Sequence, residues 1–344
     1  MALSGPSSGP PSLVGAALLG SSDAAFWDEV HALHDNDALL PPDNIRASLT
    51  RIAASVATIS TLYAFLVLLI RTAVARRRRK NSYEKRNEDN ENISNSSRCS
   101  RRGSTGDSPA PPLPHISEYK MAYQVTNLVI NLVLGLLGLY HFLYTVTPSD
   151  RTSPSQRVEG WDDLSIFGEL QIGYQLWSIP VGIWLVNEHS AMLAHHVCVM
   201  IVASMSAFFT NGFRYFTPFF YGLIESSSVP LAVMNAFRGN PQLAQRYPKV
   251  SQMSRNVFII SFFTVRFVLW MPQIIDYLRI AAMLFFTCRT TTCQVGCAMS
   301  WISAVGLTFL QLLWATKIVR GLVRLASGGG SVGGDKRGKK EKAV

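Results

Sequence analysis

Long apolar runs alternate with short polar blocks along most of the chain. Several of these runs exceed the roughly 18 residues expected of a membrane-spanning helix. Only 16% of the 344 residues are charged, which is below the roughly 25% of a typical soluble domain. The pattern predicts an all-α membrane protein with about seven transmembrane helices. The expected spans lie near residues 52–75, 123–146, 166–186, 191–210, 217–237, 256–280 and 296–320.

The charged residues are concentrated in short blocks between these runs. Arg71 and residues 76–80 directly follow the first span, whereas mostly acidic residues precede it. Residues 238–255 and the end of the chain are basic as well. Lysine and arginine accumulate in cytosolic loops, so this distribution predicts a lumenal N-terminus and a cytosolic C-terminus. Beside such long apolar runs, the net charge of +10 indicates membrane lipids as partners, and we expect no nucleic-acid binding.

Composition divides the chain into five parts. Residues 1–47 form an acidic segment expected in the lumen, and residues 48–75 form an extra transmembrane helix. Residues 76–118 hold too few apolar groups to offset chain entropy, which predicts a disordered basic cytosolic linker. Residues 119–325 contain the last six spans, and residues 326–344 form a cytosolic tail rich in glycine and lysine.

Ionisable residues inside the spans are the candidate site, because such groups usually face a bundle interior or a water-filled cavity. They are His195 and His196 in the fourth span, Glu225 in the fifth and Arg266 in the sixth. Adjacent residues on a helix point about 100° apart. We therefore expect one histidine to aim at a cavity and the other to form an interhelical hydrogen bond. A pair at i, i+1 does not chelate a metal from one helix face, so no metal and no bound cofactor are expected.

Helical spacing places these groups on two stripes, each on one face of a span. The stripe on the fifth span consists of Glu225, Ser228, Ala232 and Asn235. The stripe on the sixth span consists of Phe262, Arg266, Trp270 and Gln273. Together they predict a polar pocket that opens toward the cytosol, with Arg266 balancing Glu225. The alternative is that these polar groups only hold the helices together.

The order of these residues resembles the TLC-domain family. A His-His pair near the start of a span precedes NGFRYF (211–216) and ESSSVP (225–230), and Arg266 matches an arginine often seen in the next span. The family includes ceramide synthases, the translocon-associated TRAM protein and a ceroid-lipofuscinosis protein. The resemblance covers residues 119–325 and is nearer to the uncharacterised TLC-domain-containing branch than to ceramide synthases. It implies a six-helix barrel around a lipid-accessible cavity.

The resemblance also implies an endoplasmic-reticulum protein that acts on lipids. As an acyl-CoA-dependent acyltransferase for sphingolipids or glycerophospholipids, it would use His195, His196 and Glu225 for catalysis. The residues expected to bind substrate are Arg266, Asn235, Ser228, Trp270 and Gln273. The basic residues expected to meet the phosphates of acyl-CoA are Arg238, Arg246, Lys249 and Arg255. The alternative is a non-catalytic lipid-binding protein, a regulator of membrane composition or a trafficking factor, on the same fold.

Receptors coupled to G proteins also have seven spans and an external N-terminus. Here, however, the third span ends in Asn187-Glu188-His189 rather than in an acidic-Arg-aromatic triplet. No Asn-Pro-x-x-Tyr motif closes the seventh span. These differences disfavour a receptor.

The last residues of the chain resemble an address signal. Lys340 and Lys342 stand fifth and third from the C-terminus, as in the dilysine signal that coat proteins recognise on cytosolic tails. Such recognition returns membrane proteins to the endoplasmic reticulum. The alternative is a generic basic tail that is attracted to anionic lipid.

Three of the five cysteines lie close together in the sequence, in the predicted lumenal loop. They are Cys288, Cys293 and Cys297. The oxidising conditions of that compartment allow two of them to form a disulfide. Three free thiols are equally compatible with the sequence.

The predicted orientation is tested by two glycosylation sequons at Asn92 and Asn95. In a eukaryotic cell both should remain unmodified, because the transferase works in the lumen and the linker is expected in the cytosol. The measurement is the mass shift on glycosidase treatment. A shift that disappears with Asn92→Gln and Asn95→Gln would reverse the orientation.

Overall fold

The structure is a computed structural model. It describes residues 45–96, 118–209, 213–288 and 290–327. Over these ranges the chain forms helices and no strands, which confirms the all-α fold class. The acidic N-terminal segment before residue 45 and the lysines Lys340 and Lys342 lie outside the described residues.

The helices differ widely in length. The longer ones, in chain order, are α3 (Ile45–Ser96), α4 (Glu118–His141), α6 (Ser165–Val181), α7 (Ser190–Ser204), α8 (Ser228–Gly239), α10 (Pro248–Phe263), α11 (Trp270–Thr287) and α12 (Thr291–Ser327). The short helices α5 (Pro154–Glu159) and α9 (Pro241–Arg246) lie in connections. The π-helical segments are η1 (Phe142–Val146), η3 (Gly182–Val186), η4 (Met205–Phe209), η6 (Pro218–Gly222) and η8 (Thr264–Leu269). The 3-10 segments are η2 (Asp162–Leu164), η5 (Arg214–Phe216) and η7 (Leu223–Ser227).

Within the described residues, five helical stretches are long and apolar enough to cross a membrane. They are Ile45–Arg76, Glu118–Val146, Ser190–Phe208, Pro248–Thr287 and Thr291–Arg324. The two other expected spans are helical too, but they are not among these five. One, α6 with η3, buries the polar residues Glu169, Gln171 and Gln175, and the other is divided into η6, η7 and α8. The membrane class is thus confirmed, and the number of seven spans stays a prediction.

The first helix is longer than the sequence pattern indicates. The linker was expected to begin at residue 76 as a disordered segment; in the structure α3 continues to Ser96, so the first part of this segment is helical. Lysine, arginine and glutamate are abundant between residues 76 and 91, and all three are good helix formers. No glycine or proline interrupts the chain between residue 76 and Gly103. Helix propensity therefore outweighs the low apolar content over residues 76–96.

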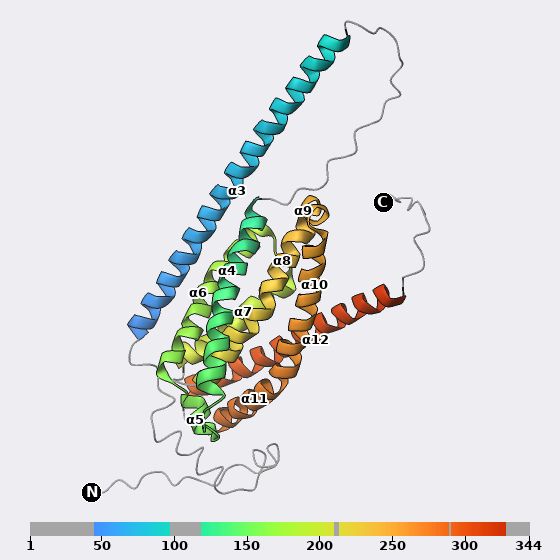
Figure 1. Cartoon of the computed structure of the whole chain (residues 1–344). Helices are drawn as coiled ribbons and strands as arrows, with labels where there is room; N and C mark the ends of the chain where they lie inside the picture. The colour runs from blue at the N-terminus through green and yellow to red at the C-terminus, as the bar shows by residue number, and fades with distance from the viewer. Residues whose placement is uncertain (1–44, 97–117, 210–212, 289, 328–344) are drawn as a thin grey trace, which may run out of the picture.

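The helices close into a ring (Figure 1). α4 packs against α8, α8 against α10, and α10 continues through η8 into α11. α11 packs against α12, α12 against α7, and α7 against α6. α3 completes the ring by packing against both α6 and α4. The resemblance implied a barrel of six helices over residues 119–325; in the structure α3 is a further member of the ring, between α6 and α4.

An ion pair between a buried glutamate and a partly exposed arginine attaches α3 to this ring. Glu169 of α6 is 1% exposed and pairs with Arg51 of α3. Ser48 Oγ and Arg51 Nη2 each donate a hydrogen bond to Glu169 Oε1 at 2.6 Å. Removing one partner of such a pair would leave a buried charge uncompensated. The extra helix is therefore an integral part of the bundle.

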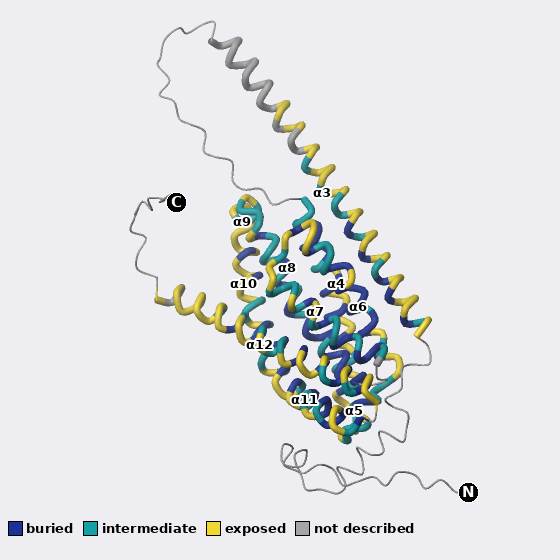
Figure 2. The backbone as a smooth tube through the Cα atoms, turned by 180° about the vertical axis from the view of Figure 1, so that it is seen from behind, coloured by how far each residue is buried: buried dark blue, intermediate teal, exposed yellow. Residues whose placement is uncertain are grey.

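Figure 2 shows exposed residues along the outer sides of the helices. Many of them are apolar: Leu68, Leu136, Ile260 and Phe309 are each more than half exposed. Monomeric soluble proteins rarely expose large apolar patches. Because the same helices bury polar residues on their inner faces, the molecule has the reversed polarity expected of a bundle in lipid.

The connection between α11 and α12 contains a disulfide between Cys288 and Cys293. The sequence left open either a disulfide or three free thiols at this loop, and the structure has the disulfide. Cys297 is a free and buried thiol one turn further along α12. We call this end of the bundle the cysteine end.

A glycine contact sets the distance between α4 and the segment η6–η7. A Cβ atom at Gly138 would overlap the backbone of Gly222 and Leu223. Small residues at such positions let transmembrane helices approach closely. At Gly321 of α12, by contrast, a Cβ atom would meet nothing within 4 Å.

This contrast gives a test with an internal control. Gly138→Ala should destabilise the purified protein by roughly 1–3 kcal/mol or more, because backbone cannot move aside as a side chain can. Gly321→Ala should leave stability unchanged or slightly raise it, because alanine is the better helix former. The measurement is the thermal unfolding midpoint in detergent. Equal midpoints for both variants would contradict the close approach.

A polar cavity inside the helix ring

The ring encloses a cavity of about 480 Å³, which we call the polar cavity. Helices α4, α6, α7, α8, α10 and α12 all contribute lining residues. Arg238 near the end of α8, Arg255 in the middle of α10 and Lys317 in the C-terminal half of α12 line it, and we call this the basic end of the bundle. This size is within the roughly 300–1,000 Å³ typical of ligand sites.

A buried ionic network forms one wall of the polar cavity. Arg266 in η8 lies 4.0 Å from Glu225 in η7, and both side chains are less than a tenth exposed. Ser228 connects them: its Oγ accepts from Arg266 Nη2 at 2.9 Å and donates to Glu225 Oε2 at 2.8 Å. Arg266 Nε also donates to Ser227 Oγ at 2.7 Å, and Gln171 Nε2 donates to Glu225 Oε1 at 3.2 Å. The expected balance of Glu225 by Arg266 is thus mediated by a serine.

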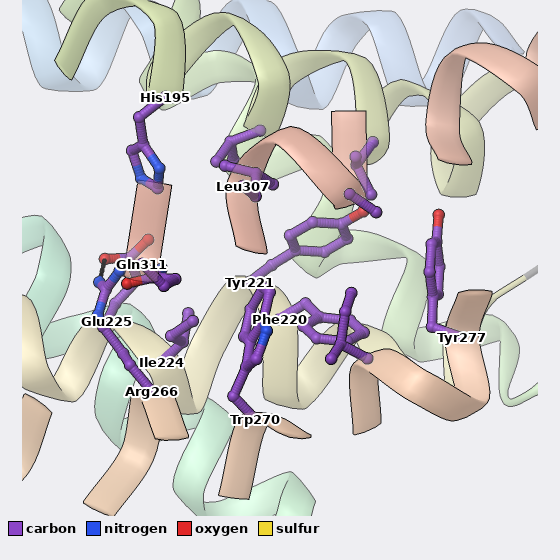
Figure 3. Close-up of a pocket in the computed structure, with 14 residues that line it drawn as sticks. His195, Phe220, Tyr221, Ile224, Glu225, Arg266, Trp270, Tyr277, Leu307 and Gln311 are labelled. Carbon is purple, nitrogen blue, oxygen red and sulfur yellow. Dashed lines mark ion pairs between the residues drawn. The ribbon is translucent and has the colours of Figure 1, made fainter. Parts of the chain in front are cut away.

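His195 of α7 points from the opposite wall toward this network, as Figure 3 shows. Its ring packs edge-on against Trp314 of α12, with the ring centres 5.4 Å apart. Its Nδ1 atom is buried and has no hydrogen-bond partner among the described residues. His195 therefore lines the cavity with a ring that has a buried nitrogen without a described protein partner.

His196 differs from its neighbour in having a protein partner. Its Nε2 atom lies 3.4 Å from Ser178 Oγ of α6, a weak interhelical hydrogen bond. Ser178 in turn bonds to the hydroxyl of Tyr123 on α4 at 2.8 Å. His196 also lines the polar cavity and is 5% exposed. The two adjacent rings thus have the two environments that helical geometry predicts.

A second, narrower cavity of about 30 Å³ begins at the same residues. His195, Glu225 and Arg266 line both cavities. The rest of the narrow cavity is mostly apolar, and its walls include Val199, Val202, Ile224, Trp270 and Leu307 (Figure 3). The three ionisable groups consequently stand where a polar space meets an apolar one.

Several buried polar atoms that line these cavities have no partner among the described residues. Besides the Nδ1 atoms of both histidines, they are Asn131 Oδ1, Gln175 Oε1 and Gln311 Oε1. Buried polar atoms are normally hydrogen-bonded, and each exception needs an explanation. A ligand with hydroxyl or amine groups would satisfy these acceptors.

The structure brings most of the residues expected from the sequence to the cavities. All four residues of the first stripe line the polar cavity: Glu225, Ser228, Ala232 and Asn235. Of the second stripe, Phe262 and Arg266 line the polar cavity, and Trp270 lines only the narrow one. Gln273 lines neither, and Ile274 and Tyr277 take its place. The π-helical η8 lies before these positions, and its wider turns shift the register of α11.

The basic residues expected near the donor phosphates divide into two groups. Arg238 and Arg255 line the polar cavity, whereas Arg246 and Lys249 lie outside it. Sequence reasoning assigned no site role to α12, yet Gln311, Trp314 and Lys317 all line the cavities. Their spacing of three residues places them on one helical face, which was the available signal.

The fold and the site define a class: a multi-pass membrane protein whose helix ring encloses a polar cavity. The family model described as the TLC domain matches residues 120–320, which is more than half of the chain. The chain therefore belongs to the TLC-domain family, and this points to lipid biology. No curated protein and no solved structure matches the chain.

The buried network predicts an unequal response to mutation. Arg266→Leu should destabilise the protein by about 3–5 kcal/mol, because it leaves the Glu225 carboxylate buried without its cation. The double variant Glu225→Gln/Arg266→Leu should recover part of this loss. Arg255→Leu, at the exposed basic end, serves as control and should change stability by less than about 0.5 kcal/mol. The measurement is thermal unfolding in detergent, and equal shifts for Arg266→Leu and the control would contradict the network.

Proposed function

We propose that the protein is an enzyme of the endoplasmic-reticulum membrane that transfers an acyl group to a lipid acceptor. The observation that carries this proposal is the position of His195, where the polar and the apolar cavity meet. A single imidazole there contacts both the polar head and the apolar chain of an amphiphilic substrate. A thioester such as acyl-CoA is the expected donor.

In this mechanism His195 acts as general base. Its free nitrogen removes the proton from an acceptor hydroxyl or amine while that atom attacks the carbonyl carbon of the donor. The carbonyl oxygen becomes negatively charged, and the nearby Arg266 guanidinium stabilises this charge. The bond to the thiolate then breaks, and the proton passes from the imidazole to the leaving sulfur.

His196 and Glu225 have supporting roles in this scheme. The contact of His196 with Ser178 fixes one ring of the pair and so orients α7 against α6. Glu225 receives its hydrogen bonds from Gln171 and Ser228 rather than from a histidine. It therefore positions Arg266, and its role is electrostatic.

The narrow cavity limits the donor chain. At about 30 Å³ it has room for roughly one water-sized group. A longer acyl chain needs side chains such as Phe220, Trp270 and Leu307 to move apart. Since these are lining residues without a bond to the ionic network, their motion leaves Glu225 and Arg266 in place.

Two observations support the proposed location in the endoplasmic-reticulum membrane. Lys340 and Lys342 form the dilysine-like end of the chain. The Cys288–Cys293 disulfide lies at the end of the bundle opposite the basic end, as expected if the cysteine end faces an oxidising lumen. Both agree with a cytosolic C-terminus and with coat-protein recognition of the tail.

A second candidate is a non-catalytic lipid-binding protein on the same fold. The observation that favours it is that neither histidine bonds to a carboxylate among the residues that the structure describes. A base in an enzyme is commonly oriented by such a third group. In this case the free nitrogen of His195 would bind a lipid head group without reacting.

Acyl transfer separates the two candidates. Purified protein is supplied with acyl-CoA and a lipid extract, and acylated products are measured by mass spectrometry. His195→Ala should reduce product formation by about 10²–10⁴-fold, and His196→Ala should reduce it less. His189→Ser is the matched control, because this histidine caps α7 and lies outside both cavities. Full activity in His195→Ala, or no turnover by the folded wild type, would favour the non-catalytic candidate.

A further inference from the structure

The ring of helices is closed unevenly. At the cysteine end α11 lies between α10 and α12, because it continues from α10 and packs against α12. Toward the basic end, α10 packs against α8 and α9, and α12 has no comparable contact with α10. In Figure 1 the C-terminal half of α12 runs away from α10. The two helices therefore diverge toward the basic end.

The polar cavity extends into this divergence. Phe258 and Ile259 of α10 line it on one side, and Ile318 and Leu322 of α12 line it on the other. Gly321 lines it as well, is exposed, and has open space where a side chain would be. Two apolar walls that do not pack against each other leave a lateral opening between them.

Three cations surround the cavity at the height of this opening. Arg238, Arg255 and Lys317 come from three different helices, and all three are exposed. None of them has a side-chain hydrogen bond or an ion pair with another described residue. Glu188 is the single carboxylate that lines the cavity besides Glu225. Since Arg266 is already paired with Glu225, the opening keeps an excess of positive charge.

This combination fits a phosphate-bearing amphiphile. Arginine and lysine bind phosphate through charge-assisted hydrogen bonds, and the apolar walls fit hydrocarbon chains. Acyl-CoA from solution and a phospholipid from the membrane share this chemistry. The surroundings favour the phospholipid, because Val257, Ile260 and Val319 beside the opening are exposed and apolar, as lipid-facing residues are.

We propose that an anionic phospholipid enters the polar cavity sideways between α10 and α12. Arg238, Arg255 and Lys317 hold its phosphate. Its chains lie between the apolar walls of the two helices, and its head group extends toward His195. This binding goes beyond the proposed acyl transfer and holds whether or not the bound lipid then reacts.

The test measures lipid retention by the full-length protein. Protein in nanodiscs of phosphatidylcholine with a minor fraction of phosphatidic acid is transferred to detergent, and bound lipid is counted by native mass spectrometry. The triple variant Arg238→Gln/Arg255→Gln/Lys317→Gln should retain phosphatidic acid at least about tenfold less well. The matched control Arg246→Gln/Lys249→Gln/Arg320→Gln removes the same charge at the same end, outside the cavity, and should retain it like the wild type.

A second pair of variants tests the lateral route. Gly321→Phe places a ring at the opening, where a Cβ atom would meet nothing within 4 Å, and should slow the loading of phosphatidic acid, while all three cations remain. Val319→Phe, which points outward from the same helix, should load normally. A failure of Gly321→Phe to slow loading would overturn lateral access.

Two outcomes would overturn the assignment of the ligand. Equal losses in both triple variants would reduce the effect to general surface charge. Complete displacement of phosphatidic acid by CoA would assign the cations to a soluble donor.

A third outcome separates this inference from the proposed acyl transfer. Phosphatidic acid retained by His195→Ala, in which transfer is lost, would support lipid binding independently of the chemistry.

Discussion

The arrangement of the interior depends on one requirement, the pairing of Glu225 with Arg266 away from water. A buried carboxylate or guanidinium is tolerated when the opposite charge and hydrogen bonds accompany it. The two residues come from η7 and η8, so their pairing joins the fifth and sixth helical segments of the ring. The hydroxyl groups of Ser227 and Ser228 accept hydrogen bonds from the Arg266 guanidinium, whose closest approach to Glu225 is 4.0 Å. The wall of both cavities is consequently set by electrostatics rather than by apolar packing alone.

The same requirement explains how far the sequence predicts the site. The stripe from Glu225 to Asn235 was found by spacing, because α8 is regular beyond Ser228. Gln273 was misplaced because η8 is π-helical around Arg266. π-helical turns are rare, and the serines to which Arg266 bonds come from a neighbouring segment that is not visible in the local pattern. The all-α class and the membrane character needed only the length and composition of the runs.

The lining residues on α12 show a second limit to what the sequence predicts about the cavity. Gln311, Trp314 and Lys317 share one face, but spacing alone does not reveal which helix that face meets. The answer depends on α12 packing against α7, far earlier along the chain, as well as against the preceding helix α11. The uneven closure of the ring follows from the same contacts, because α11 separates α10 from α12 at one end only. Long-range packing of this kind decides where a cavity opens, whereas local periodicity decides what can line it.

The environments of the two adjacent histidines depend on both local helical periodicity and long-range packing. Their 100° separation on α7 directs one ring to Ser178 of α6 and the other past Trp314 into the cavity. His196 has a protein partner at Nε2, whereas Nδ1 of His195 is buried without a partner among the described residues. Burying that nitrogen without a partner costs free energy in the empty protein. A ligand that bonds to it recovers this cost, so the unsatisfied ring itself favours binding and places the polar part of the ligand beside Arg266.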